Sequence, residues 1–141
     1  MMVTIIDGTK MLLGRLASNV AKRALLGEEV AIVNSEKVVI SGSKKYIMER
    51  RLELLHVGQP NYGPFYPRAP DRFVKRVIKG MLPCKRARGR EALKRVKCYI
   101  GFPEDFKKEK LQNLENADSK RLQYRKVVTI GAISKRMGVK L

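Results

Sequence analysis

Acidic residues, histidine and cysteine are all scarce in this sequence. The chain has 141 residues but only 13 Asp and Glu, against 31 Lys and Arg, so its formal net charge is +18. Solubility alone does not require so large an excess. Because self-repulsion of this size opposes folding unless a polyanion neutralises it, the charge indicates a large anionic partner rather than a small-molecule substrate.

The few cysteine and histidine side chains restrict metal and redox chemistry. The chain contains only Cys84, Cys98 and His56, which cannot supply the four ligands of a structural zinc site. A zinc finger or ribbon is therefore excluded, and we expect no metal and no cofactor. We find no signal peptide, so we expect two reduced thiols in a cytosolic protein and no disulfide. The single imidazole near a helix end is interpreted as structural or as an RNA contact.

Long apolar runs are also missing. Runs such as Val30 to Val33 are far shorter than the roughly 20 residues that cross a bilayer, so we expect no membrane partner beyond what charge alone could attract. A hydrophobic content of 44% is enough for one real core. We therefore predict a single domain over residues 1–141.

Short β-branched runs alternate with segments of helical periodicity. Because parallel strands need helical crossovers, this alternation predicts an α/β sandwich around a mostly parallel sheet. The expected strands are residues 3–6, 30–33, 38–40, 96–100 and 126–128. The expected helices are 15–26 before Gly27, one starting near Ser43, one between Pro70 and Pro83, one around 91–95, and 130–137 with Thr129 as its N-cap. Residues 104–141 are interpreted as a C-terminal extension.

The helix between Pro70 and Pro83 separates its charged residues from its apolar ones. Four basic residues fall within one arc of roughly 100°, and these are Arg72, Lys75, Arg76 and Lys79. The opposite half is apolar and consists of Phe73, Val74, Val77, Ile78, Met81 and Leu82. We therefore predict a rigid basic face, anchored in the core by Phe73, Val77 and Met81.

This helix lies in a basic segment that runs from residue 68 to residue 97. The segment contains twelve Lys or Arg against only Asp71 and Glu91, whereas ordinary solvated faces mix both signs. We predict that residues 85–90 form a pliable loop that orders only on RNA, with glycine and proline letting the backbone approach phosphates while arginines hold their oxygens. The predicted RNA-binding residues are Arg68, Arg72, Lys75, Arg76, Lys79, Gly80, Pro83, Lys85, Arg86, Arg88, Gly89, Arg90, Lys94 and Arg95.

A proline-rich loop, residues 57–70, precedes the basic helix. Four of the six prolines lie between Gln59 and Pro70, so this stretch is expected to be extended rather than helical. The loop carries Tyr62, Phe65 and Tyr66. These rings could stack on unpaired bases, but we prefer the interpretation that they pack the loop onto the core.

Two features near the amino terminus raise enzymatic alternatives. Gly8 and Gly14 surround a strand-to-helix turn, but their spacing, Arg15 in place of lysine and Leu16 in place of Ser or Thr do not fit a phosphate-binding loop. Asp7 lies at the end of the first expected strand, where it could serve a magnesium-dependent nuclease. A turn role is the preferred interpretation of Asp7, and a general DNA-binding protein is the remaining alternative.

Several stretches together resemble the universal large-subunit ribosomal protein thirteen family. Its amino-terminal pattern is similar to Asp7-Gly8, residues 13–18, Ala21, residues 25–27 and Val33-Asn34. Its central signature resembles Val77, residues 80–83, Gly89-Arg90, Lys97, Tyr99 and Gly101. The proline-rich stretch 63–70 looks like the archaeal and eukaryotic branch. The similarity covers roughly residues 3–103 well and continues loosely in the tail through residues 128–131 and Ile133-Ser134.

The resemblance implies a fold and a role. It implies a three-layer α/β/α sandwich around a four-stranded, mostly parallel sheet, and a structural constituent of the large ribosomal subunit in the cytoplasm. Such a protein would bind large-subunit ribosomal RNA, support subunit assembly and touch neighbouring large-subunit ribosomal proteins. The family has no catalytic residues to transfer. Its motif carries over residues 80–83, Gly89 and Arg90, and charge alone supports the other RNA-binding residues.

Overall fold

A computed structural model of the chain describes residues 3–106, 111–123 and 126–141. Within them, the α-helices are α1 Leu13–Leu26, α2 Lys44–His56, α3 Pro70–Met81, α4 Ala87–Arg95 and α5 Ile130–Arg136. The strands are β1 Val3–Asp7, β2 Glu29–Val33, β3 Val39–Ser41, β4 Val96–Cys98, β5 Leu111–Gln112 and β6 Val127–Thr129. Short 3-10 helices cover Ser35–Lys37, Glu104–Phe106, Glu115–Ala117 and Ser119–Arg121.

The main sheet has four strands in the order β4-β2-β1-β5, and all of its pairings are parallel. At its centre, β1 and β2 pair from Val3 with Glu29 to Asp7 with Val33. Both strands are largely apolar, as expected for parallel strands that are covered on both faces. The predicted parallel sheet is confirmed.

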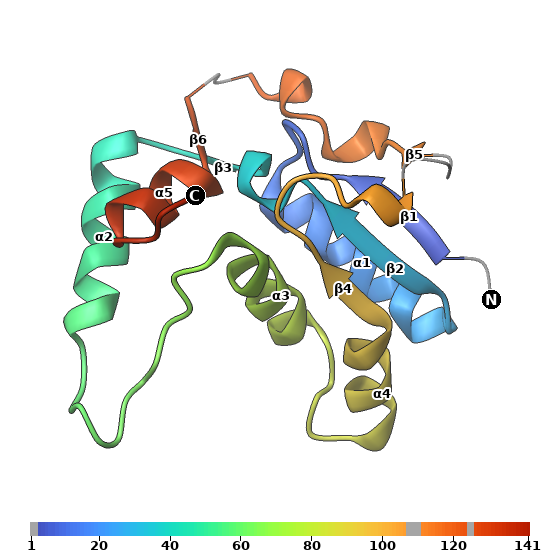
Figure 1. Cartoon of the computed structure of the whole chain (residues 1–141), viewed down its shortest axis with the longest axis horizontal. Helices are drawn as coiled ribbons and strands as arrows, with labels where there is room; N and C mark the ends of the chain where they lie inside the picture. Colours follow the sequence, from blue (N-terminus) through green and yellow to red (C-terminus); the bar gives the residue numbers. More distant parts are fainter. Residues whose placement is uncertain (1–2, 107–110, 124–125) are drawn as a thin grey trace.

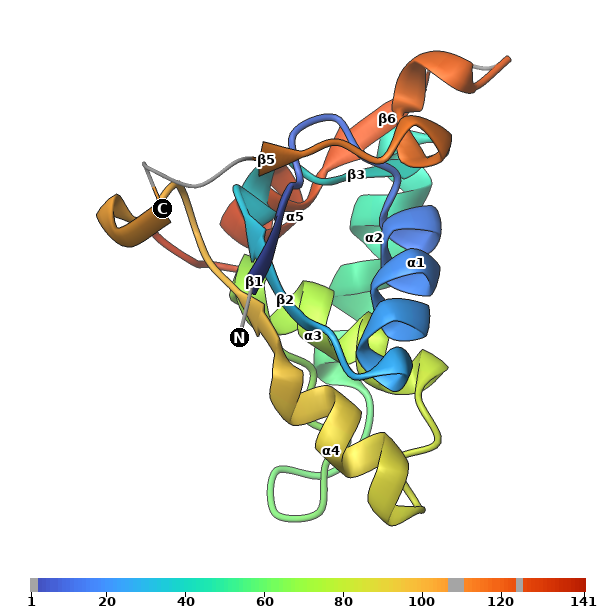
Figure 2. The same cartoon turned by 90° about the vertical axis from the view of Figure 1, so that its right-hand side faces the viewer.

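Helices and an aromatic segment cover the two faces of this sheet (Figures 1 and 2). On one face, α1 and α3 pack together and enclose the main core, which includes Leu16, Val20, Val74 and Ile78. On the other face, Tyr99, Phe102 and Phe106 pack against the buried strand residues Ile5, Ala31 and Val33. The second outer layer is thin: among the described residues, the 3-10 helix Glu104–Phe106 is the one helical turn next to these aromatics. The arrangement agrees with the expected three-layer sandwich.

One expected strand lies outside the main sheet. β3 pairs antiparallel with β6, from Val39 with Thr129 to Ser41 with Val127, in a separate two-stranded sheet. The edge of the main sheet is instead β5, whose two exposed residues carry no apolar pattern. The prediction of four strands in the main sheet is confirmed, but β3 is not one of them.

The helix boundaries follow local signals in the sequence. α1 ends at Gly27, whose φ of 103° places it in the left-handed region that glycine adopts most easily. α3 begins at Pro70, where a missing backbone N–H costs nothing. α5 begins after Thr129, whose hydroxyl accepts a hydrogen bond from the Ala132 amide at 3.3 Å, which confirms the predicted N-cap. None of the helices in the described ranges is both long and apolar enough to cross a membrane.

Candidate nucleic-acid interface

Helix α3 presents one charged side and one buried side, as its sequence predicts. Phe73, Val74 and Ile78 are buried in the core, which fixes the helix in place. Arg72, Arg76 and Lys79 are exposed on the other side, and Lys75 is half-buried. The prediction that Met81 anchors the helix is wrong, because this residue is 44% exposed at the helix end. Leu82, one residue later, is buried in its place.

Arg76 fastens the proline-rich loop to α3. Its Nη1 donates a hydrogen bond to the Phe65 carbonyl oxygen at 2.6 Å. Its guanidinium also lies over the ring of Tyr66, 4.2 Å from the centroid, a stabilising cation–π arrangement. Arg76 therefore holds the loop in addition to contributing charge to the surface.

The stretch from Lys85 to Arg90 is not the pliable loop that the sequence indicated. Backbone hydrogen bonds order the turn before α4, from the Cys84 amide to the Leu82 carbonyl and from the Arg86 amide to the Pro83 carbonyl. Helix α4 then begins at Ala87 and includes Arg88 and Arg90. Sequence reasoning missed the first turn of α4 because four closely spaced basic residues and a glycine are typical of a flexible loop.

Gly89 explains how α4 can pack so closely on this turn. It is buried, and a Cβ at this position would lie against the carbonyl carbon and oxygen of Pro83 and 2.9 Å from the Cys84 nitrogen. These are backbone atoms, so no side-chain rotation could relieve the overlap. In the described structure Gly89 therefore has a packing role, different from the close phosphate approach that its surroundings in the sequence suggested.

Most of the predicted RNA-binding side chains are exposed. The exposed basic ones are Arg68, Arg72, Arg76, Lys79, Lys85, Arg86, Arg88, Arg90 and Lys94, while Lys75 and Arg95 are half-buried. Gly80 and Pro83 are exposed as well. Arg95 turns toward the protein, since its Nη1 donates to the Ala24 carbonyl at the end of α1 at 3.3 Å. This contact places a positive charge at a helix C-terminus, where it is stabilising.

A depression of about 650 Å³ lies between the basic face of α3 and the segment that leads into α4. It is lined by Pro67, Arg72, Lys75, Arg76, Lys79, Gly80, Cys84 and Leu93. Four of its eight lining residues are cationic and none is acidic. The structure thus brings residues from α3, α4 and the proline-rich loop to one concave basic surface.

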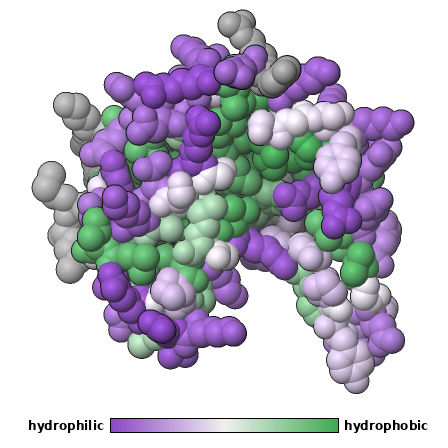
Figure 3. All heavy atoms as spheres, turned by 180° about the vertical axis from the view of Figure 1, so that it is seen from behind, coloured by the Kyte–Doolittle hydropathy of each residue, from purple (hydrophilic) through white to green (hydrophobic). Residues whose placement is uncertain are grey.

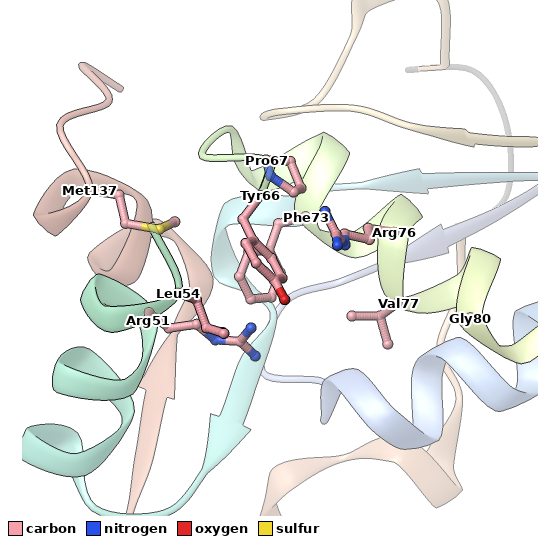
Figure 4. A pocket seen from close by; sticks show the side chains of 9 residues that line it. All are labelled: Arg51, Leu54, Tyr66, Pro67, Phe73, Arg76, Val77, Gly80 and Met137. Carbon is pink, nitrogen blue, oxygen red and sulfur yellow. The ribbon is translucent and has the colours of Figure 1, made fainter. Parts of the chain in front are cut away.

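A smaller cavity of about 220 Å³ opens beside it, between α2 and α3 (Figure 4). Its walls include the rings of Tyr66 and Phe73 and the guanidinium groups of Arg51 and Arg76. Arg51 lies over the Phe73 ring, 4.6 Å from its centroid. Burial lowers the pKa of the Arg51 guanidinium; Tyr66 raises it, and the positive charges of Arg50 and Arg76 lower it further. Sequence reasoning missed Arg51, because α2 mixes charges of both signs.

The three aromatic residues of the proline-rich loop have different environments. Tyr66 packs beneath Arg76, as the preferred interpretation expected. The same expectation is wrong for Tyr62 and Phe65, which are 85% and 71% exposed. An extended loop without periodicity gave no signal for this difference. Two exposed rings beside a basic surface are available for stacking on bases.

Asp7 makes the contacts of a turn residue. Its Oδ1 accepts hydrogen bonds from the Thr9 amide at 3.0 Å, the Thr9 hydroxyl at 2.8 Å and the Asn34 side-chain amide at 2.9 Å. Burial raises the pKa of this carboxyl, but the hydrogen bonds from Asn34 and Thr9 outweigh it, and the net shift is downward. Among the described residues no three His, Cys, Asp or Glu side chains gather as a metal site would need.

The two cysteines are both free. The Cys84 thiol donates to the Lys79 carbonyl at 3.4 Å. Burial raises the pKa of the Cys98 thiol to about 12, so this thiol stays protonated. His56, the last residue of α2, is exposed.

Fold and surface together define a class of protein: a small α/β domain with a concave basic surface at α3, α4 and the proline-rich loop. Known proteins narrow this class. The family model described as "Ribosomal protein L13" matches residues 1–105. One similar relative is the "Large ribosomal subunit protein uL13" of Methanococcoides burtonii, which is 47% identical over 98% of this chain and 99% of its own length. The protein of the same name from Methanosarcina barkeri is 45% identical over 98% of this chain and 99% of its own length. The protein of the same name from Methanopyrus kandleri is 45% identical over 98% of this chain and 88% of its own length.

The chain therefore belongs to the ribosomal protein L13 family. This result confirms the resemblance seen in the sequence. The family is one of structural ribosomal components and not of enzymes, so Asp7 has no catalytic reaction to serve.

Proposed function

We propose that this chain is a constituent of the large ribosomal subunit in the cytoplasm, binds large-subunit ribosomal RNA through residues 68–97 and supports assembly of the subunit. Its partners are that RNA and neighbouring large-subunit ribosomal proteins. The similar relatives are named as large-subunit proteins. The observation that carries the RNA-binding part is helix α3, whose buried apolar side holds an almost unopposed row of cations at the surface.

The chemistry of this surface suits a phosphate backbone. Arginine forks and lysine ammonium groups bind phosphate oxygens through charge-assisted hydrogen bonds. Because α3 is fixed by Phe73 and Ile78, its cations keep a constant spacing, which suits a folded RNA that also presents its phosphates at fixed positions. Contacts of this kind orient a protein on RNA, and they do not read base sequence.

Binding to large-subunit ribosomal RNA tests the proposal. The informative variant is Arg72→Ala/Lys79→Ala/Arg90→Ala, because these side chains are exposed and none makes a hydrogen bond or ion pair that the described structure records. Arg76 is left intact since it holds the proline-rich loop. If each side chain contacts one phosphate, the negative slope of log affinity against log salt concentration should become shallower by about 2 to 3.

The matched control is Arg50→Ala/Lys22→Ala/Lys135→Ala, which removes three exposed cations on other parts of the surface. It should change affinity and slope much less than the first variant does. Equal effects of the two triple variants would contradict a localised interface. Equal affinity of the wild-type chain for duplex DNA and for ribosomal RNA at physiological salt would favour a general DNA-binding protein instead.

A further inference from the structure

We infer that the RNA-binding surface continues as a groove that binds an unpaired stretch of RNA. The groove runs past the basic segment to the far side of α1 and to the 3-10 helix Ser119–Arg121. The inference rests on the proposed function and extends it to residues far outside 68–97. We call this feature the long groove. It consists of four adjacent depressions, two of which are the basic depression beside α3 and the aromatic cavity described above.

The other two depressions continue the groove. The third, of about 360 Å³, is lined by Leu12, Leu13, Gly14, Arg15, Val39, Ile40, Ser41, Arg51, Val77 and Leu122. The fourth, of about 560 Å³, is lined by Arg15, Ser41, Gly42, Arg121, Leu122, Gln123 and Lys126. Figure 3, which views the molecule from behind Figure 1, shows one open hollow between the main body and a projecting lobe.

Each depression shares lining residues with the next. Pro67, Arg76 and Gly80 line both the first and the second. Arg51 and Val77 line both the second and the third. Arg15, Ser41 and Leu122 line both the third and the fourth. The four hollows are therefore neighbours along one path rather than separate sites.

Every part of the long groove carries positive charge, although the walls of the third depression are mostly apolar. Every depression has at least one arginine in its wall, and none of the described lining residues is Asp or Glu. At the far end, Asn116 positions two arginines: its carbonyl accepts from Arg15 Nη1 at 3.4 Å, and its Oδ1 accepts from Arg121 Nη1 at 3.1 Å. Glu115 lies 3.8 Å from Arg121, but it is 88% exposed and its attraction is screened by water.

Two glycines give an independent indication that a ligand approaches closely. A glycine in a helix costs up to about 1 kcal/mol relative to alanine, and less in the first or last turn, where Gly14 and Gly80 lie. Gly14 in α1 and Gly80 in α3 are the two glycines of the chain that have neither a positive φ nor any atom within 4 Å of a would-be Cβ. Nothing within the described protein requires glycine at either position. Both line the long groove, where a missing side chain lets a partner reach the helix backbone.

The aromatic cavity favours an unpaired strand over a duplex. The guanidinium groups of Arg76 and Arg51 lie over the rings of Tyr66 and Phe73, and all four side chains line this cavity. A free base stacks on planar guanidinium groups of this kind. In a duplex the bases are already stacked and paired, so they cannot enter a cavity of about 220 Å³ without leaving the helix. An acidic protein segment would match the charge but would bring no base to stack on these guanidinium groups.

Binding by Arg15→Ala/Arg121→Ala tests the far end of the groove. With large-subunit ribosomal RNA as the probe, we expect affinity to fall about tenfold or more, since a hydrogen bond to a charged group is typically worth that much. The matched control Arg50→Ala/Lys22→Ala also removes two exposed cations, and should bind within about twofold of wild type, as weak general attraction predicts. Equal affinities of the two double variants would overturn the inference.

The same experiment separates this inference from the proposed function. If Arg72→Ala/Lys79→Ala/Arg90→Ala loses affinity while Arg15→Ala/Arg121→Ala behaves as its control, the proposed function stands and the long groove does not. If neither variant loses affinity, both are overturned. The occupant is identified by comparing a labelled RNA single strand of about twelve nucleotides with its duplex, each with polyglutamate as competitor. We expect the single strand to bind more tightly than the duplex and to remain bound in the presence of polyglutamate.

The two glycines allow a test in which misfolding cannot imitate the result. Gly14→Ala and Gly80→Ala should each raise the melting temperature, by up to about 3 °C. Each should also weaken RNA binding, because it places a methyl group in the groove. Loss of affinity in a more stable protein supports close approach of RNA at these positions. Unchanged affinity in both variants would overturn that part of the inference.

Discussion

Replacing Gly89 by alanine should destabilise the protein even though alanine is the better helix former. The new Cβ would overlap the carbonyl group of Pro83 and lie 2.9 Å from the Cys84 nitrogen, so the turn and the start of α4 must separate. Such overpacking costs typically 1 to 3 kcal/mol, and contact with rigid backbone places this case at about 3. Helix propensity offsets about 1 kcal/mol, leaving a net loss of about 2 kcal/mol. At roughly 3 °C per kcal/mol for a chain of this size, the melting temperature should fall by about 6 °C.

Thermal unfolding followed by circular dichroism measures this effect, with Gly80→Ala as the matched control. The control makes the same chemical change nine residues earlier, where a Cβ meets no atom within 4 Å. It should raise the melting temperature by up to about 3 °C. The two variants should therefore differ in sign. A Gly89→Ala protein that melts at or above the wild-type temperature would refute the packing role of this glycine.

Three further predictions concern other parts of the fold. Asp7→Asn should lower stability to urea at pH 7 but make little difference well below pH 3.8. The pKa of the Asp7 carboxyl is lowered from 3.8, so the stabilising effect of the carboxylate is lost as pH falls through the folded-state pKa. An equal loss of stability at both pH values would contradict this. Cys98 should resist alkylation at pH 8 until the protein unfolds, because burial raises its pKa to about 12; labelling of native protein at the rate of a free thiol would contradict this. Thr129→Ala should lower the free energy of unfolding by about 1 kcal/mol through loss of the α5 cap, whereas Thr129→Ser should retain most of it.

Local sequence patterns predicted the parts of the fold that depend on neighbouring residues. The helical period of α1, Pro70 at the start of α3 and Thr129 as the cap of α5 each act within one or two turns, and each is found as expected. The fourth strand of the main sheet could not be predicted in this way. β5 has only two exposed residues, and its place is set by pairing with β1, more than a hundred residues earlier.

The candidate interface was predictable only where charge is concentrated along the chain. Twelve cations within residues 68–97 are visible without a structure. Arg15 and Arg121 are separated by more than a hundred positions, and only folding brings both to Asn116. The order of the turn before α4 also depends on a tertiary contact, because Gly89 lets a charged segment pack where composition alone indicated a loop.

Co-sedimentation with large ribosomal subunits tests the central claim most directly. Tagged wild-type chain should remain with the large subunits, in a lysate of the cells from which it comes, after a high-salt wash. The Arg72→Ala/Lys79→Ala/Arg90→Ala variant should be removed by that wash, while Arg50→Ala/Lys22→Ala/Lys135→Ala should remain bound. Wild-type chain found only in the unbound fraction would contradict the account, and so would equal retention of the two variants.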